Sequence, residues 1–305
     1  METAIVGGVN LLLSPHAFVG FSRAAMLSPS GTCRPFADGA DGYVRSEGAV
    51  VFVLRCEDSA AAGSVRALIV ASAVNSDGRT QGIALPGFDG QRRLLERAYR
   101  EAGFAPAMLD FIEAHGTGTA LGDPIEAAAI GAVLGRGRER GRALPIGSVK
   151  SNIGHLEPAS GAAGMLKALI ALDQRELPPT LHLDRPSARI DFDRLGLMPA
   201  SQAVPLGEGT LRCGVSSFGF GGTNAHLVMT SAPPAAPAAW RQPPHVLTVS
   251  AHCRAALGEL ARAYAARLDA GANPRALALA ESGGRALLRH RAVLHLAPAR
   301  PGAIQ

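Results

Sequence analysis

Residues 109–135 read LDFIEAHGTGTALGDPIEAAAIGAVLG, an apolar run that leads into a glycine turn and then into an alanine-rich segment. The apolar run predicts a buried strand over residues 109–114, and the alanine-rich segment predicts a helix over residues 123–135. Asp123 stands before Pro124, which favours Asp123 as the N-cap of that helix. The strand would therefore deliver His115 to a turn that opens a helix.

The turn between them carries little side-chain bulk at Gly116 and Gly118. We expect the backbone and the hydroxyls of Thr117 and Thr119 to approach a thin polar ligand there, because glycine permits close contact. A lone His-Gly pair, however, is more often a core histidine followed by an ordinary turn. A site at His115 therefore needs support from other segments.

Two further segments give that support. Residues 147–157, GSVKSNIGHLE, run from a strand-like segment into His155 and then into an Ala/Gly-rich helix. Residues 216–226, SSFGFGGTNAH, form a glycine-rich turn that contains Phe218 and Phe220. Such a turn could move and gate a site.

Lysine usage singles out one residue of the second segment. The chain has 28 arginines and only two lysines, Lys150 and Lys167, so most of its basic positions tolerate arginine. A compact ammonium can sit beside an imidazole where a broad guanidinium would not fit. Lys150 is therefore a candidate partner of the two histidines.

Seven motifs occur in order along residues 1 to about 230: GGVNLLLSP (7–15), FSRAAMLSPSGTCRPF (21–36), DGYVRSEGA (41–49), VNSDGR (74–79), EAHGTGTALGDPIEA (113–127), VKSNIGHLE (149–157) and GVSSFGFGGTNAH (214–226). With them the chain resembles the ketosynthase (β-ketoacyl synthase) domain of modular type I polyketide synthases, within the thiolase-like condensing enzymes. Any one motif would be weak, but seven in the family's order argue strongly against chance similarity.

The hydrophobic pattern predicts alternating strands and helices. Predicted strands are an opening buried strand (ETAIVGGVN) and residues 48–56, 65–75, 109–114, 144–149, 211–217 and 225–230; predicted helices are residues 15–30, 89–103, 123–135 and 158–173. This order indicates an α/β layered fold with a central buried sheet. The resemblance implies the thiolase-like αβαβα fold, of which this chain is expected to hold a part with the first half incomplete.

The resemblance also implies the reaction, a decarboxylative Claisen condensation between an acyl group on a cysteine and a malonyl-type thioester. His115 and His155 would stabilise the enolate oxygen that forms when carbon dioxide leaves, and Lys150 would orient them. Glu157 either joins this network or begins the following helix as an acid at its positive end. Both roles for Glu157 stay open at this point.

Other residues match the family's substrate-binding positions. Thr117 and Thr119 correspond to the paired threonines that meet the phosphopantetheine arm of an acyl carrier protein. Phe220 corresponds to the gating phenylalanine, with plain core packing as its alternative. Asn224 is a candidate member of the network, with a structural role favoured over a catalytic one.

The nucleophile of the reaction has no candidate in this chain. The family's active cysteine lies in a Thr-Ala-Cys-Ser-Ser-type motif upstream of GGVN, and none of Cys33, Cys56, Cys213 and Cys253 has that setting. Cys33 and Cys213 are expected to act as small buried hydrophobic residues. We expect a partial chain, inactive in condensation alone. The alternatives are a non-catalytic condensing-like subunit, a split enzyme with a complementing cysteine-bearing chain and, more weakly, a thiolase that uses free coenzyme A.

The resemblance implies no metal or redox cofactor, because substrates arrive on the phosphopantetheine arm. The implied partners are an acyl carrier protein, an acyltransferase domain or subunit, and a homodimer partner or complementing chain. The scattered cysteines, without Cys-x-x-Cys spacing, also argue against zinc and against a disulfide framework.

Composition indicates a globular protein, since 47% of residues are hydrophobic. No run reaches the roughly 18 apolar residues of a membrane span, and no signal peptide is recognisable, so a cytoplasmic location is expected. The pI near 9.4 comes from residues 232–305, which carry a net charge of +6 against −1 for residues 1–231. Because these arginines lack interleaved aromatics or a known motif, nucleic-acid binding is not expected.

The composition shifts at residue 232, so residues 1–231 are assigned to the ketosynthase and residues 232–305 to a linker unit. A stretch of proline and alanine, PPAAPAAWRQPP, is followed by a predicted strand at 245–251, a helix at 253–269 and a helix-to-strand passage at 286–296. The apolar stripe of that helix must be buried (Leu257, Leu260, Tyr264, Leu268). This region resembles the small α/β subdomain that links ketosynthase to acyltransferase.

Overall fold

The computed structural model describes residues 2–57, 65–80, 82, 85–138, 141–232, 246–274, 276–278, 281 and 286–295. The chain forms two compact units, Met1–Ala236 and Pro237–Gln305, and each is considered by itself. The proline- and alanine-rich stretch predicted to separate them lies outside the described residues. No described helix is both long and apolar enough to cross a bilayer.

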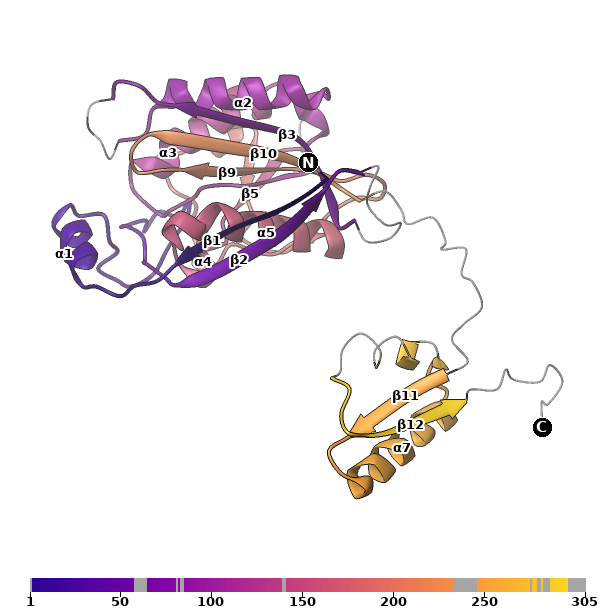
Figure 1. Cartoon of the computed structure of the whole chain (residues 1–305). Helices are drawn as coiled ribbons and strands as arrows, with labels where there is room; N and C mark the ends of the chain where they lie inside the picture. Colours follow the sequence, from indigo (N-terminus) through magenta and orange to yellow (C-terminus); the bar gives the residue numbers. More distant parts are fainter. Residues whose placement is uncertain are drawn as a thin grey trace. The chain divides into compact units, whose positions relative to one another are not determined.

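A six-stranded mixed sheet forms the centre of the first unit (Figure 1). Its strands are ordered β3 (Ala67–Ser76), β10 (Thr223–Ser231), β9 (Arg212–Phe218), β4 (Phe111–Glu113), β5 (Leu144–Gly147) and β7 (Leu197–Pro199). Strands β9, β4, β5 and β7 run parallel, and β10 is antiparallel to both of its neighbours. The parallel strands read as continuous apolar runs because both faces of the sheet are covered.

Helices cover both faces of this sheet (Figure 1). On one side lie α2 (Phe88–Ala102) and α3 (Gly122–Ile130), the latter extended by one π-helical turn, η3 (Gly131–Gly135). Their apolar side chains form the larger core with the sheet, including Leu94, Leu95, Ile112 and Ile130. On the other side lies α5 (Ser160–Gln174), which forms a second core with β9 and β4.

A two-stranded antiparallel ribbon, β1 (Thr3–Asn10) with β2 (Gly48–Arg55), forms the next layer beyond α5 (Figure 1). Phe52 and Leu54 point inward against the α5 core. The other face is open: Ile5 is 76% exposed and its cross-strand partner Val53 is 67% exposed. The opening strand is therefore formed where predicted, but the prediction that it is buried is wrong, because one face of the ribbon has no layer over it within the described residues.

Shorter elements connect the layers. They are α1 (His16–Arg23), η2 (Pro106–Met108), α4 (Lys150–Ile153), η4 (Glu157–Ala159), α6 (Phe192–Leu195) and the small antiparallel pair of β6 (Glu176–Leu177) and β8 (Val204–Pro205). The helix predicted over residues 15–30 ends at Arg23, because Ala25 adopts a left-handed φ of 51° and the chain turns. The layered α/β architecture with a central sheet is as predicted from the sequence.

The second unit pairs β11 (Val246–Ala251) with β12 (His290–His295) against α7 (Arg254–Asp269). Tyr264 of the predicted apolar stripe is buried, and Leu257 and Leu260 pack with it against the strand pair. Three of the four residues of the predicted stripe, all but Leu268, are therefore packed within this unit. The helix-to-strand passage predicted at 286–296 is wrong in its first half, since residues 286–289 are not helical and only the strand forms.

Candidate functional site

His115 lies just beyond the carboxyl end of β4, which is fully buried between β9 and β5. Its backbone N–H donates to Glu126 Oε1 at 2.7 Å, and its ring Nδ1 accepts the Phe218 N–H at 3.3 Å. Phe218 ends the neighbouring strand β9. Two elements of the sheet therefore fix both the backbone and the ring of His115, and polar groups gather at this edge as expected for carboxyl ends of parallel strands.

The glycine turn after His115 adopts conformations that require glycine. Gly116 and Gly118 have φ of 40° and 77°, in the left-handed region that favours glycine. A Cβ on Gly116 would lie 2.7 Å from Ser148 Cβ, and one on Gly118 would lie 2.8 Å from the Arg34 nitrogen. These glycines are therefore required by close packing against neighbouring protein segments, and the predicted approach to a ligand stays a prediction.

Two buried carboxylates of α3 hold this turn in place. Glu126 accepts the N–H groups of His115 and Gly116 at 2.7 and 2.8 Å, and Asp123 accepts those of Gly118 and Phe36 at 3.1 and 2.7 Å. Burial raises the pKa of Asp123 to about 6 and that of Glu126 to about 7. The turn is thus tied to a helix by three hydrogen bonds to carboxylate oxygens, which are the stronger kind, and the fourth joins Phe36 to the same helix.

Sequence reasoning missed this role of α3. Asp123 is not the N-cap, because the helix begins at Gly122 with Leu121 before it. The Asp123 side chain turns away from its own helix end to the backbone of the glycine turn. The signal in the sequence was the pair of acids three positions apart on an otherwise apolar helix, which places both on one face.

Lys150 begins α4, three residues after β5 ends. Its Nζ donates to the His115 carbonyl oxygen at 2.5 Å, and its side chain is buried. Lys150 does not line the cavity that holds the two imidazoles; it faces a second pocket of about 340 Å³, which Cys33 also lines. Lys150 therefore contacts the backbone of His115 from outside the cavity, and its ammonium does not face the cavity.

His155 follows α4, and its ring lies beside that of His115. The ring centroids are 5.4 Å apart and the planes meet at 80°. His155 Nδ1 accepts the Glu157 N–H at 2.9 Å. Since each Nδ1 accepts a backbone N–H, each ring carries its proton on Nε2. We predicted that His115, His155 and Lys150 would share one pocket: the two imidazoles do lie together, but Lys150 lines a separate pocket.

Both imidazoles are neutral in the folded protein. Burial lowers the pKa of His155 to about 2, and the nearby charge of Lys150 adds to that effect. Burial, Lys150 and His155, in that order, lower the pKa of His115 well below its usual range. The site therefore offers two uncharged Nε2–H donors close together, which can stabilise a developing oxyanion.

Glu157 pairs with Arg45 and has no described contact with Lys150. The guanidinium donates to both carboxylate oxygens, at 2.6 and 2.8 Å. Arg45 also stacks over the Phe18 ring, 4.5 Å from its centroid. Glu157 begins η4 with a φ of 44°, so it is both a helix-end acid and a backbone donor to His155. Of the two roles left open for Glu157, the structure shows the helix-end position, and its contact with the histidine pair is made by the backbone N–H, because Arg45 binds the carboxylate.

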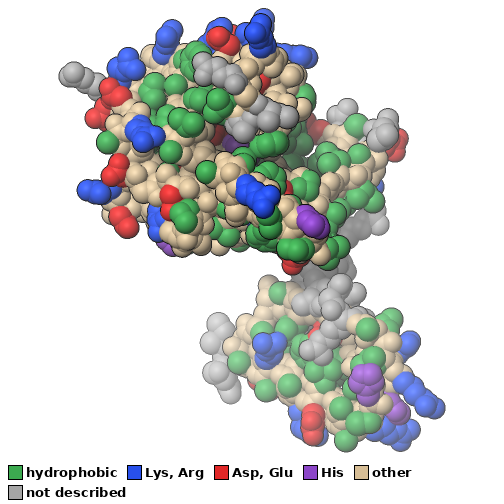
Figure 2. Space-filling model, turned by 90° about the vertical axis from the view of Figure 1, so that its left-hand side faces the viewer, with side chains coloured by type: hydrophobic (Ala, Val, Ile, Leu, Met, Phe, Trp, Pro, Cys, Tyr) green, Lys and Arg blue, Asp and Glu red, His purple; other side chains and the backbone are tan. Residues whose placement is uncertain are grey.

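A cavity of about 610 Å³ opens beside the two imidazoles. In the space-filling view, this face of the first unit is hollowed and hydrophobic side chains gather around the hollow (Figure 2). Thr117 and Thr119 line the cavity with their hydroxyl oxygens 3.1 Å apart. The lining thus combines paired hydroxyls with an otherwise largely apolar wall.

Phe220 also lines the cavity, and it is 47% exposed. Its ring meets that of Phe21 edge-on, with centroids 5.8 Å apart. Plain core packing, the alternative considered for Phe220, is therefore wrong. The ring instead lies over the cavity wall, in a turn that contains Gly219, Gly221 and Gly222.

Asn224 anchors this turn. It is buried, and its amide donates to Asp77 Oδ1 at 2.7 Å and to Asn75 Oδ1 at 3.2 Å. Asp77 N–H in turn donates to the Gly222 carbonyl at 2.8 Å. These contacts are structural: they join the end of β3 to the turn that carries Phe220.

None of the described residues that line the cavity is a cysteine. Cys33 is buried and its sulfur accepts the Val44 N–H at 3.0 Å, and burial raises the pKa of its thiol. Cys213 is buried in the core, and burial raises the pKa of that thiol as well. A thiol with a raised pKa is a poor nucleophile. No group of three or more described His, Cys, Asp or Glu side chains could hold a metal ion.

Comparison with known proteins assigns each part of the chain to related families. Residues 1–60 match the family described as Beta-ketoacyl synthase, N-terminal domain, and residues 66–184 match Beta-ketoacyl synthase, C-terminal domain. Residues 186–294 match the Ketoacyl-synthetase C-terminal extension. The first two matches together cover more than half of the chain.

Relatives in sequence are much longer proteins. The chain is 50% identical over 230 residues to a phenolphthiocerol/phthiocerol polyketide synthase of Mycobacterium tuberculosis, covering 74% of this chain and 12% of that protein. It is 43% identical over 306 residues to mycoketide-CoA synthase of the same species, covering 96% of this chain and 7% of that protein.

Solved structures show the same fold. The oxazolomycin ketosynthase domain OzmH KS7 of Streptomyces albus JA3453 matches with a TM-score of 0.81 and 34% identity, over 96% of this chain and 52% of that one. The ketosynthase from module 6 of the bacillaene synthase of Bacillus subtilis 168 matches with a TM-score of 0.80 and 32% identity, over 98% and 53%. The chain thus spans about half the length of the structures it matches, and the predicted thiolase-like fold is confirmed.

Proposed function

Because the chain belongs to the β-ketoacyl synthase family, we propose that it forms the decarboxylating half of a polyketide synthase ketosynthase. The observation that carries this proposal is the pair of neutral imidazoles 5.4 Å apart. Each presents an Nε2–H because its Nδ1 accepts a backbone N–H. Two such donors suit the thioester oxygen of a malonyl group, which becomes an enolate oxygen when carbon dioxide leaves.

The reaction has two steps, decarboxylation and condensation. In the first, the C–C bond to the malonyl carboxylate breaks, carbon dioxide leaves, and the electron pair moves into the enolate, whose oxygen accepts hydrogen bonds from His115 and His155. In the second, the enolate carbon attacks an acyl thioester on a cysteine and expels the thiolate. Only the residues for the first step, decarboxylation, line the cavity described above. We propose that the cysteine for the second step, condensation, is supplied outside these residues.

The cavity wall supports a thioester carried on a phosphopantetheine arm. The Thr117 and Thr119 hydroxyls, 3.1 Å apart, offer donors and acceptors to the amide groups of a long thin chain. The apolar remainder of the wall suits its methylene groups. We therefore propose acyl carrier proteins as the substrate-bearing partners, without a metal or redox cofactor, and Phe220 as the gate of the cavity.

The open face of the β1–β2 ribbon supports a further partner. Ile5, Val9, Val51 and Val53 are each more than half exposed on one face. Contiguous exposed apolar surface of this kind marks an interaction site. We propose that a complementing part of the ketosynthase covers this face, and that it carries the nucleophilic cysteine. Residues 186–294, which run from the first unit into the second, match the Ketoacyl-synthetase C-terminal extension. We propose an acyltransferase as the neighbouring partner.

A carbon dioxide release assay tests the proposal. The purified chain is incubated with a malonyl acyl carrier protein, and mass spectrometry follows conversion of the malonyl to the acetyl form. Slow decarboxylation without elongated product is expected from this chain alone, and elongation is expected only when a cysteine-bearing complementing polypeptide is added. An acyl adduct on any of the four cysteines of this chain, followed by elongation, would contradict the assignment of the nucleophile.

A further inference from the structure

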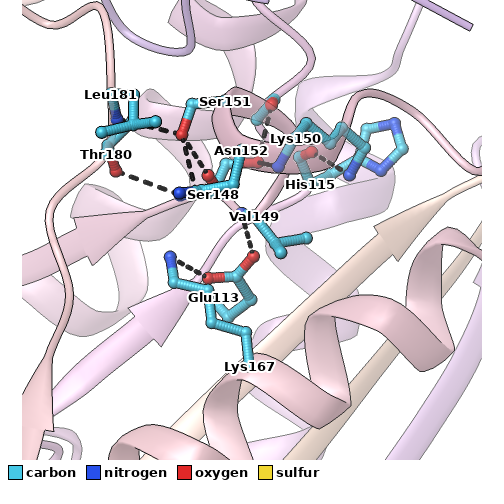
Figure 3. A network of polar contacts seen from close by, with 11 residues as sticks. Glu113, His115, Ser148, Val149, Lys150, Ser151, Asn152, Lys167, Thr180 and Leu181 are labelled. Atoms are coloured by element: carbon cyan, nitrogen blue, oxygen red, sulfur yellow. Dashed lines mark hydrogen bonds and ion pairs between the residues drawn. The ribbon is translucent and has the colours of Figure 1, made fainter. Parts of the chain in front are cut away.

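The second lysine of the chain lies outside the cavity. Lys167 projects from α5 and forms an ion pair with Glu113, the last residue of β4, with Nζ 2.8 Å from Oε2 (Figure 3). The two side chains are only 7% and 1% exposed. A buried ion pair is costly to desolvate, so its presence beside a site calls for a reason other than stability.

The other oxygen of Glu113 holds the turn between β5 and α4. Glu113 Oε1 accepts the Val149 N–H at 2.6 Å (Figure 3). The neighbouring Ser148 hydroxyl donates to the Gly116 carbonyl at 2.8 Å, and Ser151 Oγ accepts the Leu181 N–H at 3.0 Å. The turn at residues 148–151 is therefore joined to β4, to the glycine turn and to the segment before α6.

That turn carries Lys150, whose Nζ donates to the His115 carbonyl. The charged form of Lys150 is opposed mainly by burial, and Glu113 is the carboxylate that favours it most, ahead of Glu126. The other titratable groups that act on it are Cys33 and Asp123, which favour its charge, and His115 and His155, whose own protonation its charge opposes. Glu113 thus acts on Lys150 through both the backbone and its charge.

We propose that Glu113 and Lys167 form a positioning pair for the site. Glu113 fixes the Val149 backbone and so places the Lys150 ammonium against the His115 carbonyl. Lys167 holds the Glu113 carboxylate in the orientation that reaches Val149. The effect on Lys150 rests on these contacts alone, and only its consequence for decarboxylation rests on the proposed function.

The space around the pair explains why the position holds lysine in a chain of 28 arginines. A Cβ on Gly147 would lie 3.2 Å from Lys167 Nζ, and one on Gly164 would lie 3.3 Å from Glu113 Cγ. Two glycines therefore leave room for a single ammonium between α5 and the sheet. A planar guanidinium with its wider fork would not fit there.

The test uses the fact that the chain has two lysines. With lysine labelled by carbon-13 at Cε, the NMR spectrum contains only the signals of Lys150 and Lys167, and the variant Lys167→Met leaves Lys150 alone and so assigns it. Glu113→Gln is expected to lower the protonation midpoint of Lys150 by about one pH unit, since it removes a nearby opposite charge. Lys167→Met is expected to lower it as well, by a smaller amount, because the Glu113 carboxylate is then no longer held against Val149 and supports the charge of Lys150 less.

A drop of the Lys150 midpoint in both variants is the mark of positioning, because loss of the Lys167 charge without loss of positioning would raise that midpoint instead. Glu101→Gln, which breaks the exposed Arg97–Glu101 pair on α2, serves as control and should leave the midpoint unchanged. The same midpoint in Glu113→Gln as in the unaltered chain would overturn the proposal. If Glu113→Gln does not fold, the test uses the double variant Glu113→Gln/Lys167→Met, which removes both buried charges. Its Lys150 protonation midpoint is expected to lie below that of Lys167→Met.

The rate of decarboxylation, measured beside the Lys150 midpoint, distinguishes failure of this inference from failure of the proposed function. Glu113→Gln should lower the rate about tenfold, since small displacements in a catalytic site have effects of that order or larger. A chain that fails to decarboxylate at all, while its Lys150 midpoint drops in both variants, would refute the proposed function and leave the positioning pair standing. An active chain whose Glu113→Gln variant keeps both its rate and its Lys150 midpoint would refute the positioning pair alone.

Discussion

The cavity end of the six-stranded sheet and the outer face of the β1–β2 ribbon differ in how fully other parts of the described chain contact their side chains. At the cavity end, His115, His155 and Glu126 are held by hydrogen bonds from several elements. On the ribbon, valine and isoleucine side chains face outward, with Val53 67% exposed. The histidine pair is thus held by contacts within this chain, whereas the outer face of the ribbon has no layer over it in the described residues.

Loss of either imidazole should have the largest effect on the activity of the cavity end. His115→Ala or His155→Ala removes one of two oxyanion donors, so the decarboxylation rate should fall by about 10²–10³-fold. The measurement is conversion of a malonyl to an acetyl thioester, followed by mass. His252→Ala, which alters an exposed histidine of the second unit, should leave the rate unchanged. Equal rates in all three variants would show that the imidazoles are not the donors.

Loss of the Glu126 carboxylate, which accepts the N–H groups of His115 and Gly116, should have the next largest effect. Glu126→Gln replaces two acceptor oxygens by one oxygen and one NH₂, so one of the N–H groups of His115 and Gly116 meets another donor. A loss of about 1–3 kcal/mol in the free energy of unfolding is expected, since a buried donor stays unsatisfied. Denaturant unfolding measures it. Glu101→Gln, at an exposed position of α2, should change this free energy by less than about 0.5 kcal/mol, and equal losses would contradict the buried role of Glu126.

Much of the cavity end could be predicted from the sequence. Short apolar runs followed by His115 and His155 placed both histidines beyond strands of one sheet, and parallel strands bring such ends together. The sequence also identified the two threonines and Phe220 at positions that the structure places on the cavity wall. The histidines and the threonines follow from local patterns, whereas the choice of Phe220 as the gate came from the resemblance to the ketosynthase family.

The contacts that orient these residues could not be predicted in the same way. Glu126 reaches His115 and Arg45 reaches Glu157 across 11 and 112 positions of the chain, and no local periodicity encodes such distances. Asp123 had a good local explanation as an N-cap, and tertiary contacts overrode it. The exposure of the ribbon was missed for a similar reason: an apolar strand reads as buried whether or not its cover is part of the same chain.

A buried histidine outside the cavity makes the interior of the first unit sensitive to pH. His226 lies between Ser216 and Tyr99, at 3.0 and 3.2 Å, and burial lowers its pKa to about 3. Below pH 6.5 the unfolded chain binds a proton here that the folded chain does not, so stability falls as pH drops from 6.5 towards 3. His226→Gln should flatten this fall by about 1.4 kcal/mol per pH unit.

Unfolding by denaturant at several pH values checks the slope. Asp123 and Glu126 have raised pKa values and act with the opposite sign, but they are present in both proteins and cancel in the difference. His16→Gln, at an exposed histidine of the same unit, is the matched control and should keep the slope of the unaltered chain. An unchanged slope in His226→Gln would mean that the imidazole is not kept neutral by burial.

The smallest effect on stability is expected on the outer face of the ribbon. Val53→Thr exchanges an exposed methyl for a hydroxyl and should change the free energy of unfolding by less than about 0.5 kcal/mol. Leu54→Ala, one residue away on the inner face, should cost about 2 kcal/mol or more, because its side chain packs against the α5 core. Val53→Thr should at the same time reduce self-association in light scattering, since it interrupts the exposed apolar face. If Val53→Thr instead destabilised the chain as much as Leu54→Ala, the outer face would already be covered within this chain, and the proposed complementing partner would have no surface left to bind.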